Sequence, residues 1–311
     1  MKNKANAIRY SFVIPTYNYA GYIASAINSV LEAAKARSDV EVVVVDDGST
    51  DETWQLLSSM ACKESRLRVF RQDNQGPSAA RNAGAERGRG EYLWFLDADD
   101  RLAAGALSCF DQSVENLPPF DMLFGGYQSF NDGRIGKKNV PVTGMRESKA
   151  LFLESIFSEL VGLCVGSSII KRETFMKVRF PVGVHNSEDT VMYSLVIATG
   201  KVFSVSEVVV FTRRHETSLR NSISMNVESG FKAAECLFDN DMLPAEYRKY
   251  RSRFLSYRYL EMSRLYYVNN MFSECINLYM RGVRVCPRNF FLVSYFRKYM
   301  KALIRAAFAW R

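Results

Sequence analysis

The sequence lacks the features by which membrane-spanning and disulfide-linked proteins are usually recognised. No uncharged apolar run reaches about 18 residues, whereas a helix that crosses a bilayer needs about 20. The six cysteines form no CxxC pair and show no metal-ligand spacing, and there are only two histidines. This pattern predicts buried, reduced thiols in a reducing compartment, and it argues against a disulfide framework or a cysteine-rich metal site.

Glycine is also missing where nucleotide-binding folds usually need it. The first apolar stretch ends in Pro15-Thr16-Tyr17-Asn18, and the next glycine is Gly21. A dinucleotide-dependent oxidoreductase would have a GxGxxG turn at this point, and no GxxxxGK[ST] phosphate loop occurs anywhere in the chain. The sequence therefore predicts that phosphates, if bound, are not held by a glycine-rich loop in the usual place.

Acidic residues are scarce at one end of the chain. Residues 1–225 contain 26 Lys and Arg against 26 Asp and Glu, whereas residues 226–311 contain 15 against 7. The net charge of +8 therefore belongs entirely to the last 86 residues. We expect a neutral body followed by a basic region that meets an anionic partner.

What the sequence does contain is a repeated strand–helix pattern. Four apolar stretches, YSFVIP, VEVVVV, LRVFRQ and EYLWFL, alternate with segments of helical periodicity. The valine-rich second stretch is typical of a strand buried on both faces. Ser49 and Glu52 have the spacing of a capping box at the start of the second helix. The alternation predicts an α/β fold with a Rossmann-like, mostly parallel sheet flanked by helices, followed by a C-terminal helical region.

Polar residues follow each of the four predicted strands, where ligands bind in such sheets. The groups are Thr16-Tyr17-Asn18, Asp46-Asp47, Gln75-Gly76 and Asp97-Ala98-Asp99-Asp100. Any one group is explained as a loop or a helix cap, but four on one edge are not so easily explained. The crowded carboxylates of the last group repel one another unless a cation lies between them. Their hard oxygens suit Mn²⁺ or Mg²⁺, which can bridge to a substrate diphosphate.

Four sequence blocks, taken in order, resemble one enzyme family. They are VIPTYN, VVDDGSTDET, NQGPSAARNAGAERGRGEYLWFLDADD and SEDT. Together they are similar to the family 2 inverting glycosyltransferases of the GT-A fold, over residues 8–215. The resemblance implies a GT-A catalytic domain at residues 1–225 that uses a nucleotide sugar and a divalent metal. Residues 226–311 form the basic helical region outside it.

The resemblance also implies roles for individual residues. Asp47 would accept a hydrogen bond from the uracil or ribose of the donor, and Thr16 and Tyr17 would line that pocket. Arg81 would neutralise charge or hold the nucleotide-side loop, although a surface arginine on a helix is an alternative. The expected metal ligands are Asp99, with Asp97 and Asp100. The expected substrate-binding residues are Pro15, Thr16, Tyr17, Asp47, Gly76, Arg81, Asp97, Arg214, His215 and Ser218.

The SEDT block carries the expected catalytic base. The resemblance implies that Asp189 deprotonates the acceptor hydroxyl, although Ser187 stands where the family usually has glycine. The block has a second explanation, because Ser187 and the two acids would also suit the first turn of a helix. Arg214, His215 and Ser218 match a segment that covers the nucleotide in the family, and a basic surface loop explains them about as well.

The resemblance therefore implies an inverting transfer of a sugar from a nucleoside diphosphate sugar, in the first place a UDP-sugar. The acceptor would be a hydroxyl of a glycan or lipid-linked molecule in bacterial surface polysaccharide synthesis. Two alternatives stay open. A metal-dependent nucleotidyl or phosphoryl transferase would not need Asp189, and a non-catalytic nucleotide-sugar-binding subunit would bind the donor without turnover.

The last predicted helix has a basic face that contains Arg297, Lys298, Lys301 and Arg305. The opposite face contains Phe296, Tyr299, Met300, Leu303, Ala307 and Trp310. A basic amphipathic helix is typical of contact with an anionic membrane surface, so we expect a cytoplasmic enzyme held at the inner face of the cell membrane. Packing on the catalytic domain or within a homo-oligomer is the alternative. Nucleic acid is not an expected partner, because no binding motif for it is present.

Overall fold

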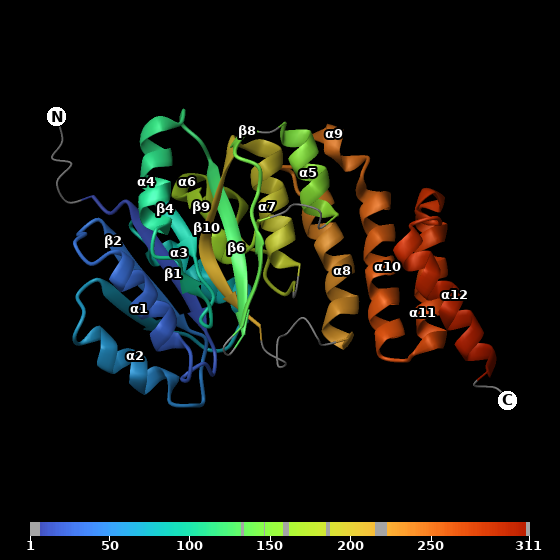
Figure 1. The fold of residues 1–311 in the computed structure, drawn as a ribbon, viewed down its shortest axis with the longest axis horizontal. Helices are drawn as coiled ribbons and strands as arrows, with labels where there is room; N and C mark the ends of the chain where they lie inside the picture. The colour runs from blue at the N-terminus through green and yellow to red at the C-terminus, as the bar shows by residue number, and fades with distance from the viewer. Residues whose placement is uncertain are drawn as a thin grey trace.

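The computed structural model describes residues 7–131, 134–145, 147–157, 162–184, 187–214 and 223–308. Within these residues, a single twisted sheet is flanked by helices and is followed by a group of C-terminal helices (Figure 1). This arrangement confirms the predicted α/β class and the helical C-terminal region. Among the described residues, none of the helices combines the length and apolar character that a bilayer-spanning segment requires.

The four predicted strands form the parallel half of the sheet. They are β1 (Tyr10–Thr16), β2 (Val40–Asp46), β3 (Leu67–Arg71) and β4 (Tyr92–Phe95), in the spatial order β3-β2-β1-β4. Every residue of β2 is buried, as its valine run predicted. All three pairings in this half are parallel, so the four carboxyl ends meet at one edge of the sheet.

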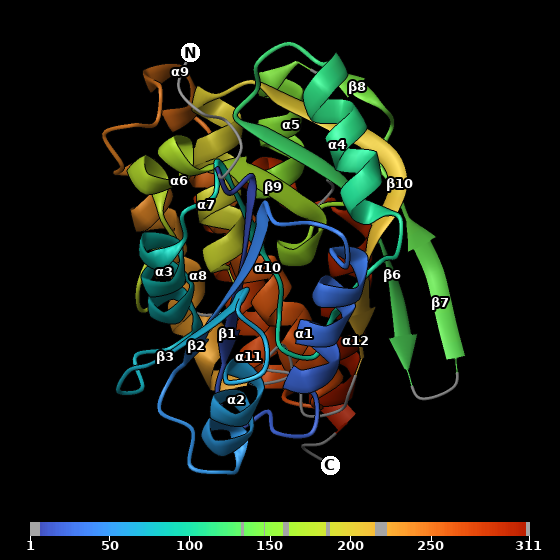
Figure 2. The ribbon, with the colours of Figure 1, turned by 90° about the vertical axis from the view of Figure 1, so that its left-hand side faces the viewer.

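The second half of the sheet contains antiparallel pairs that the strand–helix pattern did not predict. β9 (Ser168–Lys171) lies antiparallel between β4 and β6 (Met122–Asn131), and β6 runs parallel to β10 (Val202–Arg213). Three short strands complete it: β5 (Arg101–Leu102), β7 (Arg134–Asn139) and β8 (Gly144–Met145). Figure 2 shows the β6–β7 hairpin projecting from the sheet.

Helices cover both faces of the sheet. One core lies beneath α1 (Ile23–Ala33), α2 (Thr53–Ala61) and α4 (Ala106–Asn116). The other lies beneath α3 (Pro77–Arg87), α5 (Ser148–Ile156), α6 (Arg172–Val178) and α7 (Glu188–Thr199). Gly84 lets α3 lie directly on β1, because a Cβ there would stand 2.4 Å from a Val13 methyl carbon. This close approach fixes the position of α3 relative to the strand ends.

The predicted capping box is wrong. Helix α2 begins at Thr53 and its N-cap residue, Glu52, makes no side-chain cap bond. The Ser49 hydroxyl instead accepts a hydrogen bond from the Asn18 N–H, and the Asp51 carboxylate accepts one from the Thr53 N–H. Ser49 therefore joins the loops that follow β1 and β2, and Asp51 takes the capping role.

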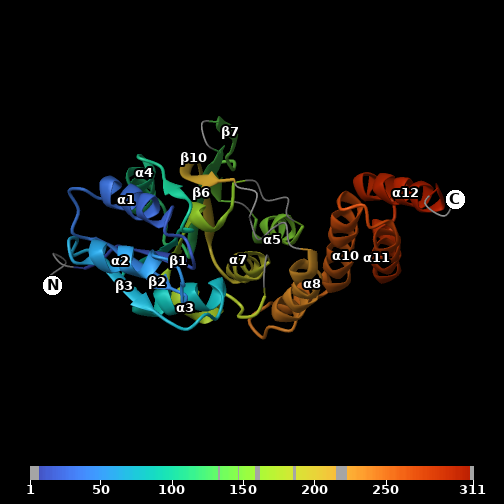
Figure 3. The same cartoon turned by 90° about the horizontal axis from the view of Figure 1, so that it is seen from below.

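The C-terminal helices extend away from β1, β2 and β3 (Figures 1 and 3). They are α8 (Ile223–Phe238), α9 (Ala245–Arg248), α10 (Arg251–Val268), α11 (Phe272–Val285) and α12 (Val293–Phe308). Helix α8 packs between α7 and α10, and Leu237 and Phe254 belong to the same core as α7. The hydrophobic core of the sheet thus continues into the helices after residue 226.

Part of the α12 face that we expected to meet a membrane packs against the protein, because Phe296, Tyr299 and Leu303 are half-buried whereas Met300 and Ala307 are exposed. Tyr299 stacks on Tyr279 of α11 with ring centroids 4.2 Å apart, and Phe296 contacts Phe290. Ala302, between this face and the basic one, is fully buried. Trp310 lies outside the described residues. The apolar periodicity of α12 was therefore correctly detected, and part of its partner is the helical region itself.

Candidate active site

The candidate site lies where the parallel strands end. Pro15 lies at the point where the hydrogen-bond ladder between β1 and β4 stops. The Val13 carbonyl accepts a hydrogen bond from the Leu96 N–H, and the Thr16 carbonyl accepts one from the Asp47 N–H. The backbone groups of successive β1 residues therefore point alternately toward β4 and β2. Pro15 therefore faces the β4 side just beyond the last ladder bond. Its missing N–H costs no hydrogen bond there, and the chain after β4 is free to diverge from β1.

The loops after β1 and β2 are tied to each other. Asn18, in the left-handed conformation with φ 58°, accepts a hydrogen bond from the Thr50 N–H through its side chain. Thr16 is buried, and Tyr17 beside it is 43% exposed. Thr16 and Tyr17 were expected to line the pocket for the base and ribose of the donor. Of the two, only the Tyr17 ring is accessible.

Asp47 organises the neighbouring loop in this structure. Its carboxylate accepts hydrogen bonds from the Gln72 side chain at 2.8 Å and from the backbone N–H groups of Gln75 and Gly76 at 3.0 and 2.8 Å. Gly76 adopts a positive φ of 86°, which favours glycine, and it precedes Pro77 at the start of α3. Asp47 and Gly76, which were both expected to bind substrate, are therefore in direct contact. A contact between Asp47 and a nucleotide stays a prediction.

The three carboxylates of the DADD turn have different surroundings. Asp97 is partly exposed and accepts a 2.7 Å hydrogen bond from Arg81 Nη2. Asp100 is 6% exposed and accepts a 2.9 Å hydrogen bond from the backbone N–H of Arg213. Asp99 lies between them in sequence and is half-buried. The turn is therefore held at both ends by protein donors.

Arg81 connects this turn to the SEDT block. Arg81 is 5% exposed, and its guanidinium donates to Glu188 Oε1 at 3.0 Å as well as to Asp97 and lies over the Phe180 ring. Burial acts to lower the pKa of Arg81, but the carboxylates of Asp97 and Glu188 outweigh it and raise that pKa. Arg81 is thus a buried, fully charged bridge, and the surface-arginine alternative is wrong.

The SEDT block forms the start of α7, as the helix-start explanation of the block predicted. Ser187 is the N-cap residue but makes no side-chain cap bond, and the first turn contains Glu188 and Asp189. Burial, and then the neighbouring Asp189 charge, raise the pKa of Glu188 although Arg81 acts in the opposite direction. Asp189 is half-buried, and its carboxylate accepts from the Thr190 N–H at 2.7 Å. Of the two acids, Asp189 is the more accessible.

Tyr19 and Glu188 belong to this cluster although the sequence did not identify them as site residues. Burial, followed by the charges of Asp99 and Asp97, raises the pKa of Tyr19 to about 12. Tyr19 follows the VIPTYN block directly, and this position was the available signal. Glu188 was visible as the neighbour of Asp189 in the SEDT block, but its bond to Arg81 was not, because the two residues are 107 positions apart.

Several buried polar atoms at this edge have no hydrogen-bond partner within the described part of the chain. They are Thr16 Oγ1, Ser78 Oγ, Arg81 Nε and Glu188 Oε2. Buried polar groups in native proteins are nearly always paired, so these atoms need partners such as water or a polar ligand. The four residues lie at the end of β1, in the first two turns of α3 and at the first residue of α7.

The same edge fits a divalent ion that is shared with a diphosphate. In the described residues, no preassembled group of three or more His, Cys, Asp or Glu side chains could hold a metal ion alone. Mg²⁺ commonly takes only one or two protein carboxylates and completes its shell with substrate phosphates and water. The donor set of Asp97, Asp99 and Asp100 is therefore compatible with a metal that arrives with the nucleotide.

The end of β10 approaches the DADD turn. The Arg213 guanidinium lies over the rings of Tyr22 and Phe130, at 5.0 and 4.6 Å from their centroids. Arg214 is exposed, and its N–H donates to the Phe130 carbonyl. His215 and Ser218, also expected at the site, lie outside the described residues.

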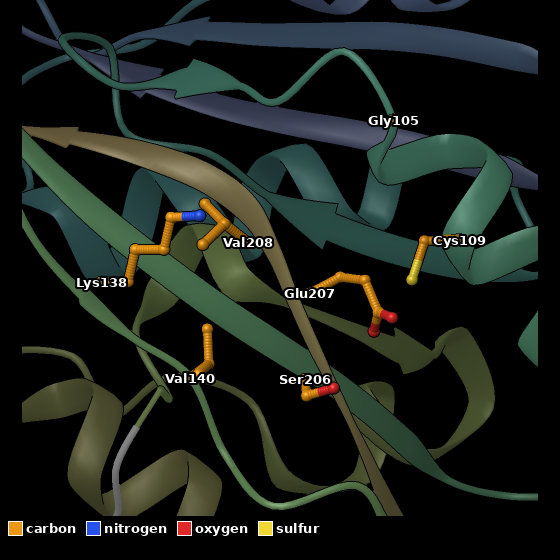
Figure 4. Close-up of a pocket in the computed structure, with 7 residues that line it drawn as sticks. All are labelled: Gly105, Cys109, Lys138, Val140, Ser206, Glu207 and Val208. Atoms are coloured by element: carbon orange, nitrogen blue, oxygen red, sulfur yellow. The ribbon is translucent and has the colours of Figure 1, made fainter.

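Two surface hollows in the described part of the chain do not coincide with these strand ends. The one drawn in Figure 4 has a volume of about 430 Å³ and is lined by α4, β7 and the middle of β10, with Lys138 and Glu207 among its residues. A second hollow, of about 420 Å³, is lined by Ala20 and by α2 with its N-cap residue. The candidate site is therefore defined by converging polar side chains at the strand ends and not by either hollow.

A parallel strand edge with a DADD turn, joined to an acidic helix start, matches the arrangement that the resemblance to GT-A glycosyltransferases led us to expect. Comparison with known proteins supports this class. The family description "Glycosyl transferase family 2" matches residues 11–178, which is more than half of the chain. The chain belongs to glycosyl transferase family 2.

Two curated relatives extend the comparison. The chain is 25% identical over 220 residues to glycosyltransferase GlyG of Streptococcus pneumoniae. This match covers 67% of this chain and 72% of GlyG. It is 26% identical over 215 residues to the minor teichoic acid biosynthesis protein GgaB of Bacillus subtilis. That match covers 66% of this chain but only 23% of GgaB, so it concerns one part of a much longer protein.

A solved structure shows the same fold over nearly the whole chain. Residues 1–349 of TarS from S. aureus, crystallised with UDP-GlcNAc, match with a TM-score of 0.67 and 20% identity. The match covers 95% of this chain and 89% of the TarS chain, so it includes the C-terminal helices. At this identity the likeness shows the fold, which confirms the predicted GT-A architecture.

Proposed function

We propose that the protein transfers a sugar from a nucleoside diphosphate sugar, in the first place a UDP-sugar, to an acceptor hydroxyl with inversion at the anomeric carbon. The observation that carries the proposal is the shared arginine. Arg81 binds Asp97 of the DADD turn and Glu188 of the acidic helix start in one buried cluster. The two acidic blocks needed for donor and acceptor chemistry therefore belong to a single site.

In the proposed reaction, Asp189 accepts the proton of the acceptor hydroxyl as its oxygen attacks the anomeric carbon. The bond from that carbon to the diphosphate oxygen breaks on the opposite face, and a nucleoside diphosphate leaves. Glu188 is a poorer candidate for the base, because it is 9% exposed and one of its oxygens is bonded to Arg81. Asp189 is adjacent, more accessible and not paired with an arginine in the described part of the chain.

The negative charge that develops on the leaving diphosphate needs stabilisation. We propose that Asp99, assisted by Asp97 and Asp100, holds Mn²⁺ or Mg²⁺, which when bound supplies positive charge to that diphosphate. Thr16 and Tyr17 would line the base and ribose pocket beside Asp47. Arg214 extends from the end of β10, where it would add positive charge on the same side.

The classes of donor and acceptor are supported by the relatives. TarS was crystallised with UDP-GlcNAc, which supports a UDP-sugar donor for a chain of the same fold. GgaB takes part in minor teichoic acid biosynthesis, which supports a surface polysaccharide or its lipid-linked precursor as the acceptor. The proposal therefore places this protein in the synthesis of a bacterial surface glycan.

We also propose that the C-terminal helices hold the enzyme against an anionic membrane surface. The basic surplus of residues 226–311 supports this, and α12 keeps an exposed stripe although its other side is packed. Val293 and Ile304 of α12 are 68% and 54% exposed, and Phe291, just before the helix, is 76% exposed. Arg297 and Lys301 are exposed on the same helix. Apolar side chains flanked by cations suit the boundary between headgroups and acyl chains.

A donor-hydrolysis screen tests the enzymatic proposal without a known acceptor. The protein is incubated with Mn²⁺ and a panel of UDP-, GDP- and dTDP-sugars, and the released nucleotide is measured. We expect release of UDP from at least one UDP-sugar and loss of release in EDTA. Binding of UDP-sugars without turnover by any of them would favour the non-catalytic alternative, and turnover unaffected by Asp189→Asn would favour the phosphoryl transferase.

A further inference from the structure

The bridge between the DADD turn and helix α7 is built from groups that are expensive to bury. Arg81 is 5% exposed and Glu188 is 9% exposed, while the third member, Asp97, is partly exposed. A buried ion pair seldom contributes more stability than an apolar packing of the same volume, because removing two charges from water costs several kcal/mol. Its presence at this place therefore calls for an explanation other than stability.

The geometry of the bridge is directional. Arg81 Nη2 donates to Asp97 at 2.7 Å and Arg81 Nη1 donates to Glu188 at 3.0 Å. A planar guanidinium fixes the angle between its two nitrogens, so the two carboxylates are held at a set separation. The Phe180 ring beneath the guanidinium, 5.1 Å from its centroid, restricts the plane further.

The bridge links two parts of the proposed site, the DADD turn and the start of α7. Asp97 belongs to the DADD turn, and Glu188 is the first residue of α7 and immediately precedes Asp189. A bridge that fixes Asp97 relative to Glu188 therefore fixes the metal-binding turn relative to the proposed base. Small misplacements of reacting groups are costly, because an error of about 1 Å can reduce the rate about 100-fold.

We infer that Arg81 and Glu188 are positioning residues, and that the Asp97–Arg81–Glu188 bridge sets the placement of Asp189 relative to the donor site. Neither residue needs to touch the reacting atoms. Arg81 acts through Asp97 and Glu188, and Glu188 acts through the first turn of α7. The inference rests on the proposed function, since it assigns Asp189 as the base.

The test uses the full chain with the UDP-sugar that the hydrolysis screen identifies. Glu188→Ala removes the acceptor of the Arg81 hydrogen bond, whereas Glu188→Gln keeps an oxygen at the same place. We expect Glu188→Ala to lower kcat by roughly 10–100-fold, the range typical of orienting groups behind a site, with donor KM changed by less than about threefold. Glu188→Gln should recover most of that loss.

Arg81→Met and the double variant Arg81→Met/Glu188→Ala complete the design. If Glu188 acts only through Arg81, the double variant is no slower than Arg81→Met alone. Multiplied losses in the double variant would show that the two residues act independently, which would overturn the bridge. Calorimetry with UDP and Mn²⁺ gives a readout besides activity, and Glu188→Ala should leave UDP affinity unchanged.

Glu41 offers a matched control elsewhere in the sheet. It is 1% exposed on β2 and is bound by Arg68 and Arg89, at the opposite end of the strand from Asp46. Glu41→Gln should lower the melting temperature and leave kcat unchanged. Turnover of every variant is measured at a temperature at which all of them remain folded, so that loss of structure is separated from loss of positioning.

The outcomes separate this inference from the proposed function. If Asp189→Asn is inactive while Glu188→Ala turns over like wild type, the bridge has no positioning role and only this inference fails. If Asp189→Asn is as active as wild type, the proposed base is wrong. Equal losses in Glu188→Ala and Glu188→Gln would also overturn the bridge, because the hydrogen-bond acceptor would then make no difference.

Discussion

The carboxylate of Asp100 accepts a hydrogen bond from the backbone N–H of Arg213 at 2.9 Å, across 113 residues of sequence. The Asp100 side chain is nearly buried, and the Arg213 guanidinium lies over the rings of Tyr22 and Phe130. The last carboxylate of the DADD turn is thus joined to the end of β10. It anchors the turn in addition to any contact with a metal ion.

Replacing Asp100 separates these two roles. Asp100→Ala leaves a backbone N–H without its acceptor, so we expect a loss of about 1–3 kcal/mol in the free energy of unfolding. Asp100→Asn keeps an acceptor oxygen and removes the charge, so it should retain most of the stability. Urea unfolding of both variants measures the difference. Equal destabilisation by Asn and Ala would mean that the charge of Asp100, and not the hydrogen bond, holds the turn.

Asp99 is expected to matter for the metal and little for the fold. Because its side chain is only half-buried, Asp99→Asn should change the free energy of unfolding by less than about 0.5 kcal/mol. Turnover should be abolished, and Mn²⁺ should no longer strengthen UDP binding. Calorimetry with UDP, with and without Mn²⁺, measures this coupling. Equal UDP affinity of the wild-type protein in Mn²⁺ and in EDTA would contradict the metal role altogether.

The sequence predicted the parallel half of the fold because its signals are local. The valines of β2 indicate a buried strand, and the acidic turn after β4 indicates a polar strand end. Each signal lies within a few residues of sequence. The Arg81–Glu188 pair could not be predicted, because it depends on how closely α3 approaches β1 through Gly84 and on where α7 begins. For α12, the periodicity revealed an apolar face but could not say whether protein or lipid covers it.

Acid should destabilise the protein partly through Glu41. Burial alone would raise the pKa of Glu41, but hydrogen bonds from Ser11, Arg89 and Arg68 outweigh it and lower that pKa. The stabilisation is present above the unfolded-state value of about 4.3 and is lost as the pH falls through the lower folded-state value. Glu41→Gln lacks this titration. Urea unfolding at pH 7 and pH 3 should therefore show a smaller gap between wild type and Glu41→Gln at pH 3, and a constant gap would refute the assignment.

Charge reversal on α12 tests the membrane proposal without removing packed residues. Each Lys or Arg near an anionic surface contributes about 1 kcal/mol, so Arg297→Glu/Lys301→Glu should weaken binding to phosphatidylserine-containing liposomes at least about tenfold. The matched control is Lys35→Glu/Lys63→Glu, which makes the same change in net charge on the exposed surface of the body. Liposome co-sedimentation at low salt compares the two. Equal binding by both variants, or no binding by the wild type, would exclude α12 as the docking element.

The stereochemistry of donor hydrolysis tests the central claim most directly. The wild-type protein is mixed with Mn²⁺ and the UDP-α-sugar that it hydrolyses, and the anomeric proton of the released sugar is followed by NMR before it equilibrates. Single displacement with Asp189 as the base predicts that the β-anomer appears first, and that Asp189→Asn slows its appearance by roughly 10²–10⁴-fold. Initial appearance of the α-anomer, or an Asp189→Asn variant as fast as wild type, would contradict the proposed mechanism.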